Sequence, residues 1–411
     1  MARFLTILSI LYIVLAFYGF QGFKTIFKSS WMQVLYAVLF FFALINLVVR
    51  AINYVPGDGL RGSISIAGGI FFSFFLLALF LGFFLLIEDI IRLLTLGYNK
   101  IVGLSEGNTS YFPSRRKFVS VIGLGIAALP FGALLYGMYK GKYNYKVLKY
   151  ELEFEDLPAA FNGYQITQIS DVHSGSFDNH EKVSYGIDLI NKQKSDVILF
   201  TGDLVNDKAT EMEPWKDSFA KLEAKDGVFS VLGNHDYGDY TQWESIEAKA
   251  QNLVDLKKLQ KDIGFDLILD SHRYLERNGE RIALVGVENW GRGGFKKAGD
   301  LNKAKEGIAK DDFKILMSHD PSHWEDVVIN DEYHFHLTLS GHTHGMQFGV
   351  EIPGWIKWSP VKWRYKYWAG LYQELGQYIN VNRGFGFIGY PGRVGIWPEI
   401  SVITLKKKGL T

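Results

Sequence analysis

The stretch Ile166-Thr167-Gln168-Ile169-Ser170-Asp171-Val172-His173 decides the fold class of this chain. It begins as an apolar, β-branched run between Gly163 and Gly175, which predicts a buried strand. Asp171 and His173 stand where that strand ends. In an extended chain alternate residues point the same way, so a carboxylate and an imidazole two positions apart can bind one cation together. This single pair is not specific by itself.

The same pattern recurs four times further along the chain, each time as an apolar run followed by side chains that can bind metal. The segments after these runs are, in chain order, Thr201-Gly202-Asp203, Gly233-Asn234-His235-Asp236, Ser318-His319-Asp320 and Ser340-Gly341-His342-Thr343-His344. Open α/β sheets hold their ligand sites at the carboxyl ends of strands. We therefore expect five strand ends to converge on one site, with the glycines allowing the sharp turns that this requires.

Taken in order, these five blocks resemble the calcineurin-like metallophosphoesterase superfamily. Its pattern is Asp-x-His, Gly-Asp, Gly-Asn-His-Asp/Glu, a lone His and Gly-His-x-His, and every block is present here. The resemblance implies an α/β fold over residues 141–411, a four-layer sandwich of two mixed sheets flanked by helices. Helical patterns between the blocks agree with this layered packing.

The resemblance also implies a site with two divalent metal ions. Asp171, His173 and His344 would hold one ion, Asn234, His319 and His342 the other, and Asp203 would bridge them. Carboxylate, amide and imidazole ligands suit Mn, Fe or Zn. A hydroxide bridging the two metals would attack a phosphomonoester, phosphodiester or pyrophosphate, so no serine or cysteine nucleophile is needed.

By the same resemblance, His235 faces the substrate and stabilises developing charge or protonates the leaving oxygen. Many relatives place an aspartate three residues after the bridging one to orient this histidine, whereas this chain has Asn206. Asn206 and Asp236 are therefore the candidates for a supporting role, and Asp207 is a third. Asp320 could support a ligand, with a solvated loop residue as the alternative.

The composition limits the possible partners and metal ligands. The chain has 411 residues, a formal net charge of +1 and no cysteine. The charge gives no reason to expect a nucleic-acid partner. Without cysteine there are no disulfides or thiolate ligands, so any metal must be bound by oxygen and nitrogen.

Four apolar segments precede the blocks and predict a transmembrane region over residues 1–140. Each is near the ~20 residues that cross a bilayer, and none carries an interior charge. The predicted helices span residues 4–20, 34–49, 64–87 and 118–139. A cleavable signal peptide is the alternative for the first, but no small-residue cleavage site follows it. Glu88 and Asp89 are expected to end the third helix with their side chains reaching the membrane surface.

Basic residues predict the orientation of this multi-pass membrane protein. The expected loop over residues 92–117 is rich in lysine and arginine, and such loops stay cytoplasmic, which places the catalytic domain outside the cytoplasm. Residues 114–119 (Ser-Arg-Arg-Lys-Phe-Val) resemble a twin-arginine export signal, with an ordinary basic cluster as the alternative. Lysines at 140, 142 and 146 weaken the charge asymmetry.

The stretch 355–368 interleaves aromatic and basic residues, which favours a membrane-facing rim. A packed hairpin with its aromatics in the core is the alternative. Residues 367–372 and 382–384 resemble a membrane-associated bacterial branch of the family, which includes enzymes that cleave lipid-linked pyrophosphates such as UDP-diacylglucosamine. The predicted partners are thus membrane lipids and a phosphate-ester substrate, with a lipid phosphate or nucleotide-lipid as the specific expectation.

Two other functions remain open at this stage. The chain could be a membrane receptor or cell-wall-binding protein that keeps the fold without turnover. All seven ligand positions hold competent residues, which a non-catalytic protein would not need, so the sequence favours a hydrolase. Transport is disfavoured because the apolar segments carry no interior ionisable group.

Overall fold

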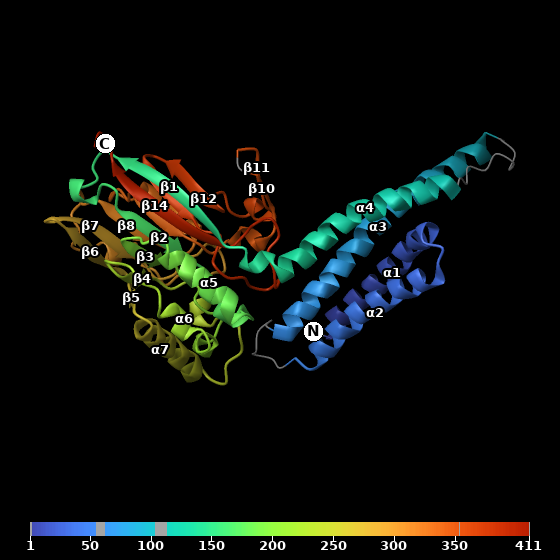
Figure 1. The fold of residues 1–411 in the computed structure, drawn as a ribbon, viewed down its shortest axis with the longest axis horizontal. Helices are drawn as coiled ribbons and strands as arrows, with labels where there is room; N and C mark the ends of the chain where they lie inside the picture. Colours follow the sequence, from blue (N-terminus) through green and yellow to red (C-terminus); the bar gives the residue numbers. More distant parts are fainter. Residues whose placement is uncertain (1, 55–61, 103–112, 353, 411) are drawn as a thin grey trace. The chain divides into compact units, whose positions relative to one another are not determined.

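The computed structural model of the chain describes residues 2–54, 62–102, 113–352 and 354–410 (Figure 1). By its internal contacts it divides into two units. The first comprises Met1–Tyr54 and Ser63–Tyr139, and the second Val55–Gly62 and Lys140–Thr411. The first unit is helical, whereas every strand among the described residues lies in the second.

Four long helices form the first unit: α1 (Ala2–Ile26), α2 (Ser30–Ile52), α3 (Gly62–Ile101) and α4 (Pro113–Tyr139). All four are long and apolar enough to cross a membrane. Each predicted apolar segment lies inside one of them. The third helix differs from the expectation, because α3 continues past residue 87 to Ile101.

The extension of α3 changes the setting of the two acidic residues. Glu88 does not end the helix but is 4% exposed and pairs with α4, at 3.1 Å from Arg115 Nη2 and 2.8 Å from Arg116 Nη1. Asp89 lies 2.7 Å from the same Arg116 nitrogen and accepts a hydrogen bond of 2.7 Å from the hydroxyl of Tyr18 in α1. In place of side chains reaching the membrane surface, ion pairs join α3 to α4 and the Tyr18 hydrogen bond joins α1 to α3.

The basic residues that were expected in a loop lie in helices instead. Arg92 and Lys100 lie in α3, and residues 115–117 lie in the first turns of α4, while residues 103–112 lie outside the described residues. The two arginines of the export-like motif are the partners of Glu88, so both have a structural role in holding α4 against α3.

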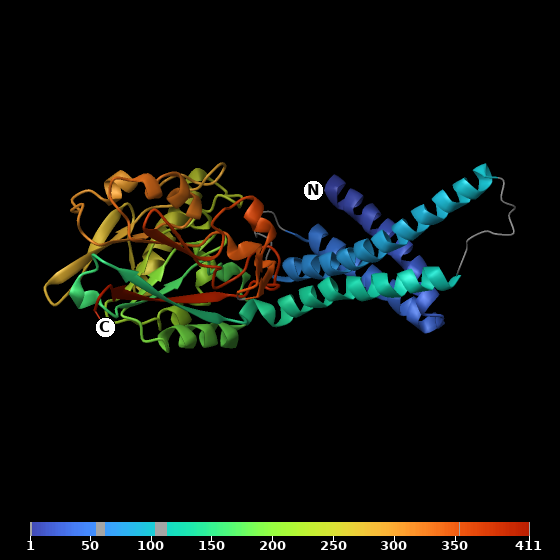
Figure 2. The same ribbon diagram turned by 90° about the horizontal axis from the view of Figure 1, so that it is seen from above.

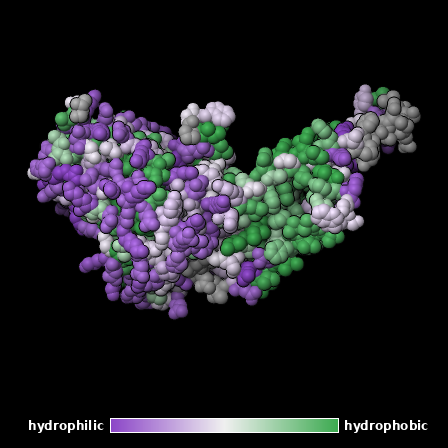
Figure 3. Space-filling model, in the orientation of Figure 1, coloured by the Kyte–Doolittle hydropathy of each residue, from purple (hydrophilic) through white to green (hydrophobic). Residues whose placement is uncertain are grey.

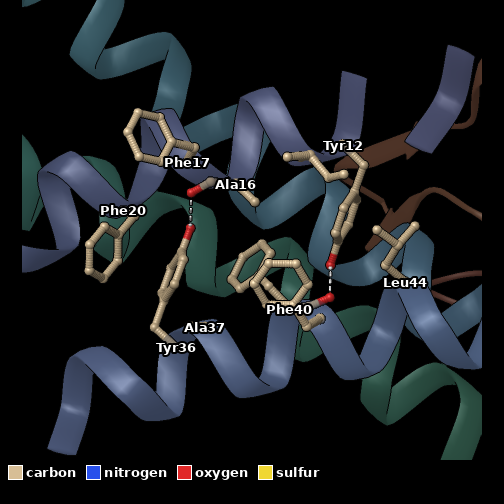
Figure 4. A pocket seen from close by; sticks show the side chains of 10 residues that line it. Tyr12, Ala16, Phe17, Phe20, Tyr36, Ala37, Phe40 and Leu44 are labelled. Atoms are coloured by element: carbon tan, nitrogen blue, oxygen red, sulfur yellow. Dashed lines mark hydrogen bonds between the residues drawn. The ribbon is translucent and has the colours of Figure 1, made fainter. Parts of the chain in front are cut away.

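A groove of about 250 Å³ runs between α1 and α2 and is lined by apolar and aromatic side chains (Figure 4). Two tyrosines cross it, and each hydroxyl donates to a carbonyl of the other helix: Tyr12 to Phe40 at 3.0 Å and Tyr36 to Ala16 at 2.9 Å. These bonds satisfy the only polar atom of each side chain in apolar surroundings. They tie the first two helices together.

The second unit contains two six-stranded mixed sheets and a separate hairpin (Figures 1 and 2). In the first sheet, β1 and β14 run parallel to each other and antiparallel to the four other strands, which are mutually parallel. In spatial order its strands are β1 (Lys146–Phe154), β14 (Glu399–Lys407), β2 (Gln165–Ile169), β3 (Val197–Phe200), β4 (Val228–Ser230) and β5 (Phe265–Leu267).

The second sheet has a parallel centre with one antiparallel strand at each edge. In spatial order its strands are β12 (Gly370–Glu374), β13 (Gln377–Val381), β9 (Leu337–Ser340), β8 (Lys314–Met317), β7 (Glu280–Gly286) and β6 (Ser271–Arg277). The hairpin is formed by β10 (Val350–Ile352) and β11 (Ile356–Trp358).

Helices cover the outer faces of both sheets. One apolar cluster lies between the sheets, with side chains such as Ile166 and Leu199 facing Ile315 and Leu339. A second packs the helices α5 (His180–Asn191), α6 (Lys216–Phe219) and α7 (Ile246–Asp262) on the first sheet, and a third packs α8 (Leu301–Ala304) and α9 (Pro321–Asp326) on the second. The predicted α/β fold with two mixed sheets between helices is confirmed.

Candidate metal centre

All seven predicted metal ligands follow strand ends that lie side by side. β2, β3 and β4 are neighbours in the first sheet, and β8 and β9 are neighbours in the second. The segment after β2 meets the segment after β9, because the His342 backbone nitrogen donates to both carboxylate oxygens of Asp171 at 3.0 Å. The two sheets thus bring their ligands to one place, as the strand-end argument predicts.

The backbone is strained at five of these ligands. Asp171, His173, Asp203, His342 and His344 adopt φ angles between 47° and 70°, in the left-handed region that L-residues rarely occupy. Such conformations cost on the order of 1–3 kcal/mol each and persist only where the surrounding structure imposes them. Their concentration here marks a site whose geometry is imposed by the fold.

Glycine is needed at two of the strand ends for space. A Cβ at Gly341 would lie 2.0 Å from Ser170 Oγ and 2.2 Å from Asp171 Oδ2, and a Cβ at Gly233 would lie 2.2 Å from Asp203 Oδ1. Gly202 alone of the three expected turn glycines has a positive φ, 97°. The expected reason, a sharp turn, therefore holds for Gly202, whereas close approach explains the other two.

Asp171, His173 and His344 form the first group that could hold a metal ion. The Nε2 atoms of the two histidines lie 3.0 Å apart, and that of His344 lies 3.2 Å from Asp171 Oδ1. Burial raises the pKa of Asp171, but His344 and His319 outweigh it and hold that pKa well below its usual range. Burial lowers the pKa of His173, so the group combines a carboxylate with a neutral imidazole.

Asp203, His319 and His342 form the second group. His319 Nε2 lies 3.1 Å from Asp203 Oδ2, which in turn lies 3.6 Å from His173 Nε2 in the first group. The Asp203 carboxylate therefore faces histidines of both groups, as a bridging ligand must. Asn234 belongs to the same set, since its Oδ1 is 2.8 Å from His342 Nδ1.

The donor atoms fit divalent cations. His319 Nδ1 donates to the Thr201 carbonyl at 2.7 Å, which leaves Nε2 as the atom with a lone pair. That Nε2 is buried and makes no hydrogen bond within the described part of the chain. Buried polar atoms without a partner are rare in native structures. Two groups of carboxylate and imidazole around one shared aspartate suit Mn, Fe or Zn, without a preference among them.

His235 lies beside the second group, with its backbone nitrogen donating to Asp203 Oδ1 at 2.9 Å. Its Nδ1 contacts the main-chain carbonyl of Asn206 at 2.7 Å. The Asn206 side chain, the expected orienting group, instead donates to Ser176 Oγ at 3.0 Å. The ring of His235 therefore takes its orientation from the backbone.

Asp236, the other supporting candidate, is fully buried and does not contact His235 through its carboxylate. It accepts hydrogen bonds of 2.8–3.3 Å from four backbone nitrogens, those of Asp203, Leu204, Val205 and Gly233. Burial, followed by the charge of Asp203, raises the pKa of Asp236 to about 7. Its role is to hold the segment after β3 against the segment after β4.

A cavity of about 410 Å³ opens over both groups. One wall carries ligands together with His235, and another carries apolar, aromatic and basic side chains. The residues of that second wall are Phe295, Met346, Pro360, Val361, Trp363, Arg364, Tyr365 and Ile388. Arg364 lies 4.8 Å from the centre of the Phe295 ring, which itself packs edge-on against His342. A cation thus stands within the cavity close to the ligands.

Comparison with known protein families agrees with this geometry. Residues 164–346 match the family model for the calcineurin-like phosphoesterase, and residues 2–142 match a model described as a probable calcineurin-like phosphoesterase transmembrane domain. The chain carries a calcineurin-like phosphoesterase domain. All seven predicted ligands lie within the matched residues of this phosphoesterase domain.

Similar proteins come from both bacteria and animals. Identity is 29% over 302 residues with the metallophosphoesterase YkuE of Bacillus subtilis, covering 71% of this chain and 98% of the relative. It is 28% over 283 residues with a metallophosphoesterase of Aquifex aeolicus, covering 68% of this chain and 99% of the relative. It is 26% over 283 residues with a transmembrane protein with metallophosphoesterase domain of Danio rerio, covering 66% of this chain and 60% of the relative. The expected assignment to one bacterial branch is thus not confirmed.

Two tyrosines that the sequence did not indicate support ligands of the phosphoesterase domain. The Tyr365 hydroxyl lies 2.8 Å from His342 Nε2, which directs Nδ1 of that ring toward Asn234. The Asn234 amide nitrogen donates to the Tyr240 hydroxyl at 2.9 Å, which directs its carbonyl oxygen toward His342. Such outer partners fix the ring orientation and amide direction of metal ligands. Tyr365 lies beyond the last motif block, so no spacing rule could point to it.

Proposed function

We propose that this protein is a membrane-anchored dimetal phosphoesterase that hydrolyses phosphoester or pyrophosphate bonds, with a lipid-borne phosphate as its substrate. The observation that carries the proposal is the position of Asp203, whose carboxylate faces His319 at 3.1 Å and His173 at 3.6 Å, one from each ligand group. A shared carboxylate between two ligand sets is what a two-metal site requires.

Divalent metal ions held by the two groups would supply a hydroxide nucleophile at neutral pH and neutralise phosphoryl oxygens. The residues of the cavity do the rest. His235, held by Asp203 and the Asn206 carbonyl, donates to the leaving oxygen or stabilises its developing charge. Arg364, across the cavity, binds a second anionic group such as the far phosphate of a pyrophosphate.

The lipid part of the proposal is supported by the four apolar helices and by exposed aromatic side chains near the cavity. A UDP-diacylglucosamine-like nucleotide lipid is one member of the proposed substrate class. The catalytic domain is proposed to lie outside the cytoplasm. This orientation rests on the basic residues at the end of α3 and the start of α4, Lys100 and Arg115 to Lys117.

The direct test is turnover by the full-length protein in lipid nanodiscs with added Mn. We expect hydrolysis of a bis-aryl phosphate, and faster hydrolysis of a lipid pyrophosphate than of a soluble nucleotide. Asp203→Ala is the control and should be inactive. Binding of Mn without turnover of any of the three phosphate esters would favour the alternative, a receptor or wall-binding protein that retains the fold.

A further inference from the structure

The aromatic stretch 355–368 divides into a buried and an exposed part. Tyr365, Tyr367 and Trp368 are buried in the core clusters, so the packed alternative is right for them. Trp355 and Trp363, by contrast, are 76% and 75% exposed. The exposed tryptophans are not part of the core and call for another explanation.

The exposed part contains β11, which pairs with β10, just before this stretch, in a two-stranded hairpin outside both six-stranded sheets (Figure 1). In its register Val350 pairs with Trp358 and Ile352 with Ile356, so these four apolar side chains share one face. Val350 is 46% exposed, and Ile352 and Ile356 are exposed as well. Hydrophobic residues are visible at the hairpin in the space-filling view (Figure 3).

The opposite face of the hairpin is polar and attaches it to the phosphoesterase domain. Glu351 and Lys357, which pair across the hairpin, lie on that face. Glu351 forms a two-pronged ion pair with the buried Arg383, at 2.6 and 3.0 Å. Lys357 donates to the Ala369 carbonyl and lies 4.7 Å from the Tyr372 ring centre.

This polarity is the reverse of that of an ordinary surface hairpin. In a half-buried hairpin the apolar face packs on the core and the polar face meets water. Here an ion pair and a hydrogen bond attach the polar face to the domain, with Lys357 still exposed, while Val350, Ile352 and Ile356 of the apolar face are exposed and Trp358 is half-buried. A contiguous apolar surface that remains exposed in the folded protein marks a site of protein or membrane interaction.

Three observations favour a lipid bilayer over a protein. Tryptophans stand at the rim of the apolar face, where they favour the headgroup level of a membrane. Lys362 lies next to Trp363, is exposed and has no carboxylate partner within 4 Å among the described residues, which leaves its charge for anionic lipid. Finally, β1 begins at Lys146, shortly after the membrane-length helix α4 ends at Tyr139, so the chain itself keeps this domain near a bilayer.

The apolar surface also leads to the catalytic cavity. Met346 and Trp363, both strongly exposed, line the cavity together with His342 and His344. We propose that Met346, the apolar face of the β10–β11 hairpin, Trp355 and Trp363, together called the aromatic rim, dock into the headgroup layer of an anionic bilayer. A lipid phosphate would then reach the ligands without leaving its membrane, and this consequence rests on the proposed function.

The test uses the absence of native cysteine. Val350→Cys in the full-length protein is labelled with an environment-sensitive fluorophore in anionic nanodiscs whose lipids carry a spin-label quencher. Val254→Cys on α7 is the matched control, because Val254 is also an exposed valine, 57% accessible. We expect lipid-borne quenching several-fold stronger at position 350 than at 254, and weaker quenching there by aqueous iodide.

Other outcomes would overturn the proposal. Equal lipid quenching at both positions, or free access of iodide to position 350, would mean that the rim faces water. Protection from both quenchers would mean that a protein, such as a second copy of the chain, covers it. None of these readouts depends on catalysis, so they stand even if the proposed function fails.

A second experiment tests whether the aromatic rim delivers lipid substrate to the site, as the proposed function requires. Trp355→Ser removes an exposed tryptophan that does not line the cavity. It should lower turnover of a lipid phosphate several-fold and leave turnover of a small soluble ester unchanged. Quenching at position 350 without any loss of lipid turnover in this variant would contradict delivery of substrate by the rim.

Discussion

Gly341→Ala offers a sharp test of how the two sheets build the metal centre. The added Cβ would lie 2.0 Å from Ser170 Oγ and 2.2 Å from Asp171 Oδ2, where ordinary contact begins at 3.4 Å. The segments after β2 and β9 must therefore separate by more than an ångström. Metal sites tolerate changes of roughly 0.2 Å in ligand distances, so we expect Asp171 to leave the first ligand group.

The expected loss of stability in Gly341→Ala follows from the same contacts. Overpacking of this kind costs about 1–3 kcal/mol, and the separation also weakens the two bonds from the His342 nitrogen to Asp171. Gly294→Ala is the control, because its Cβ meets no atom within 4 Å and its φ is ordinary. Metal content and Mn affinity should fall in Gly341→Ala alone. Equal Mn affinity in the two variants would refute the close-approach argument.

Three further predictions concern single residues. His235→Ala should lower turnover about 10²–10⁴-fold with metal content intact, since its ring is not among the proposed ligands; loss of metal would contradict this separation of roles. Tyr365→Phe should weaken metal binding about 10–100-fold through His342, whereas Tyr274→Phe, whose hydroxyl binds Asp312 at 3.0 Å far from the ligands, should not. Asp188→Cys, exposed on α5, should react with an impermeant maleimide outside the inner membrane, also in a host without the twin-arginine translocase; labelling only after lysis would reverse the orientation.

The sequence predicts which side chains meet at the candidate metal centre because these residues are local. Asp171, His173 and the other ligands follow apolar runs at fixed spacing, and strand ends of a layered sheet must meet. Partners that come from distant or irregular segments leave no such pattern. Tyr365 reaches His342 from the residues just after a short helical turn, Pro360–Trp363, and the Asn206 contact to His235 uses a backbone carbonyl that any residue could supply.

The direction of the hairpin's apolar face and the continuation of α3 past Glu88 could not be predicted from the sequence for a different reason. A period-two pattern shows that Val350 and Ile352 share a face, but it cannot say whether that face points inward, which here depends on Glu351 reaching Arg383. Similarly, a charged pair at the end of an apolar run normally marks a helix end. Glu88 is instead accommodated within a helix because the arginines of α4 neutralise it.

The carboxylate of Asp203 has a second role, and this role decides how Asp203 should be tested. Besides facing both ligand groups, Asp203 accepts the backbone N–H of His235 at 2.9 Å and so holds the catalytic loop in place. Asp203→Ala removes both functions, whereas Asp203→Asn keeps an acceptor oxygen and removes the bridging charge. We expect both variants to lose bound metal and phosphoester hydrolysis, but only the alanine variant to unfold at a lower temperature than the metal-free wild type. The shift should correspond to about 1–3 kcal/mol, the cost of leaving a buried backbone N–H without a partner. Full metal occupancy in Asp203→Asn would show that the bridging charge is dispensable and would count against a two-metal site.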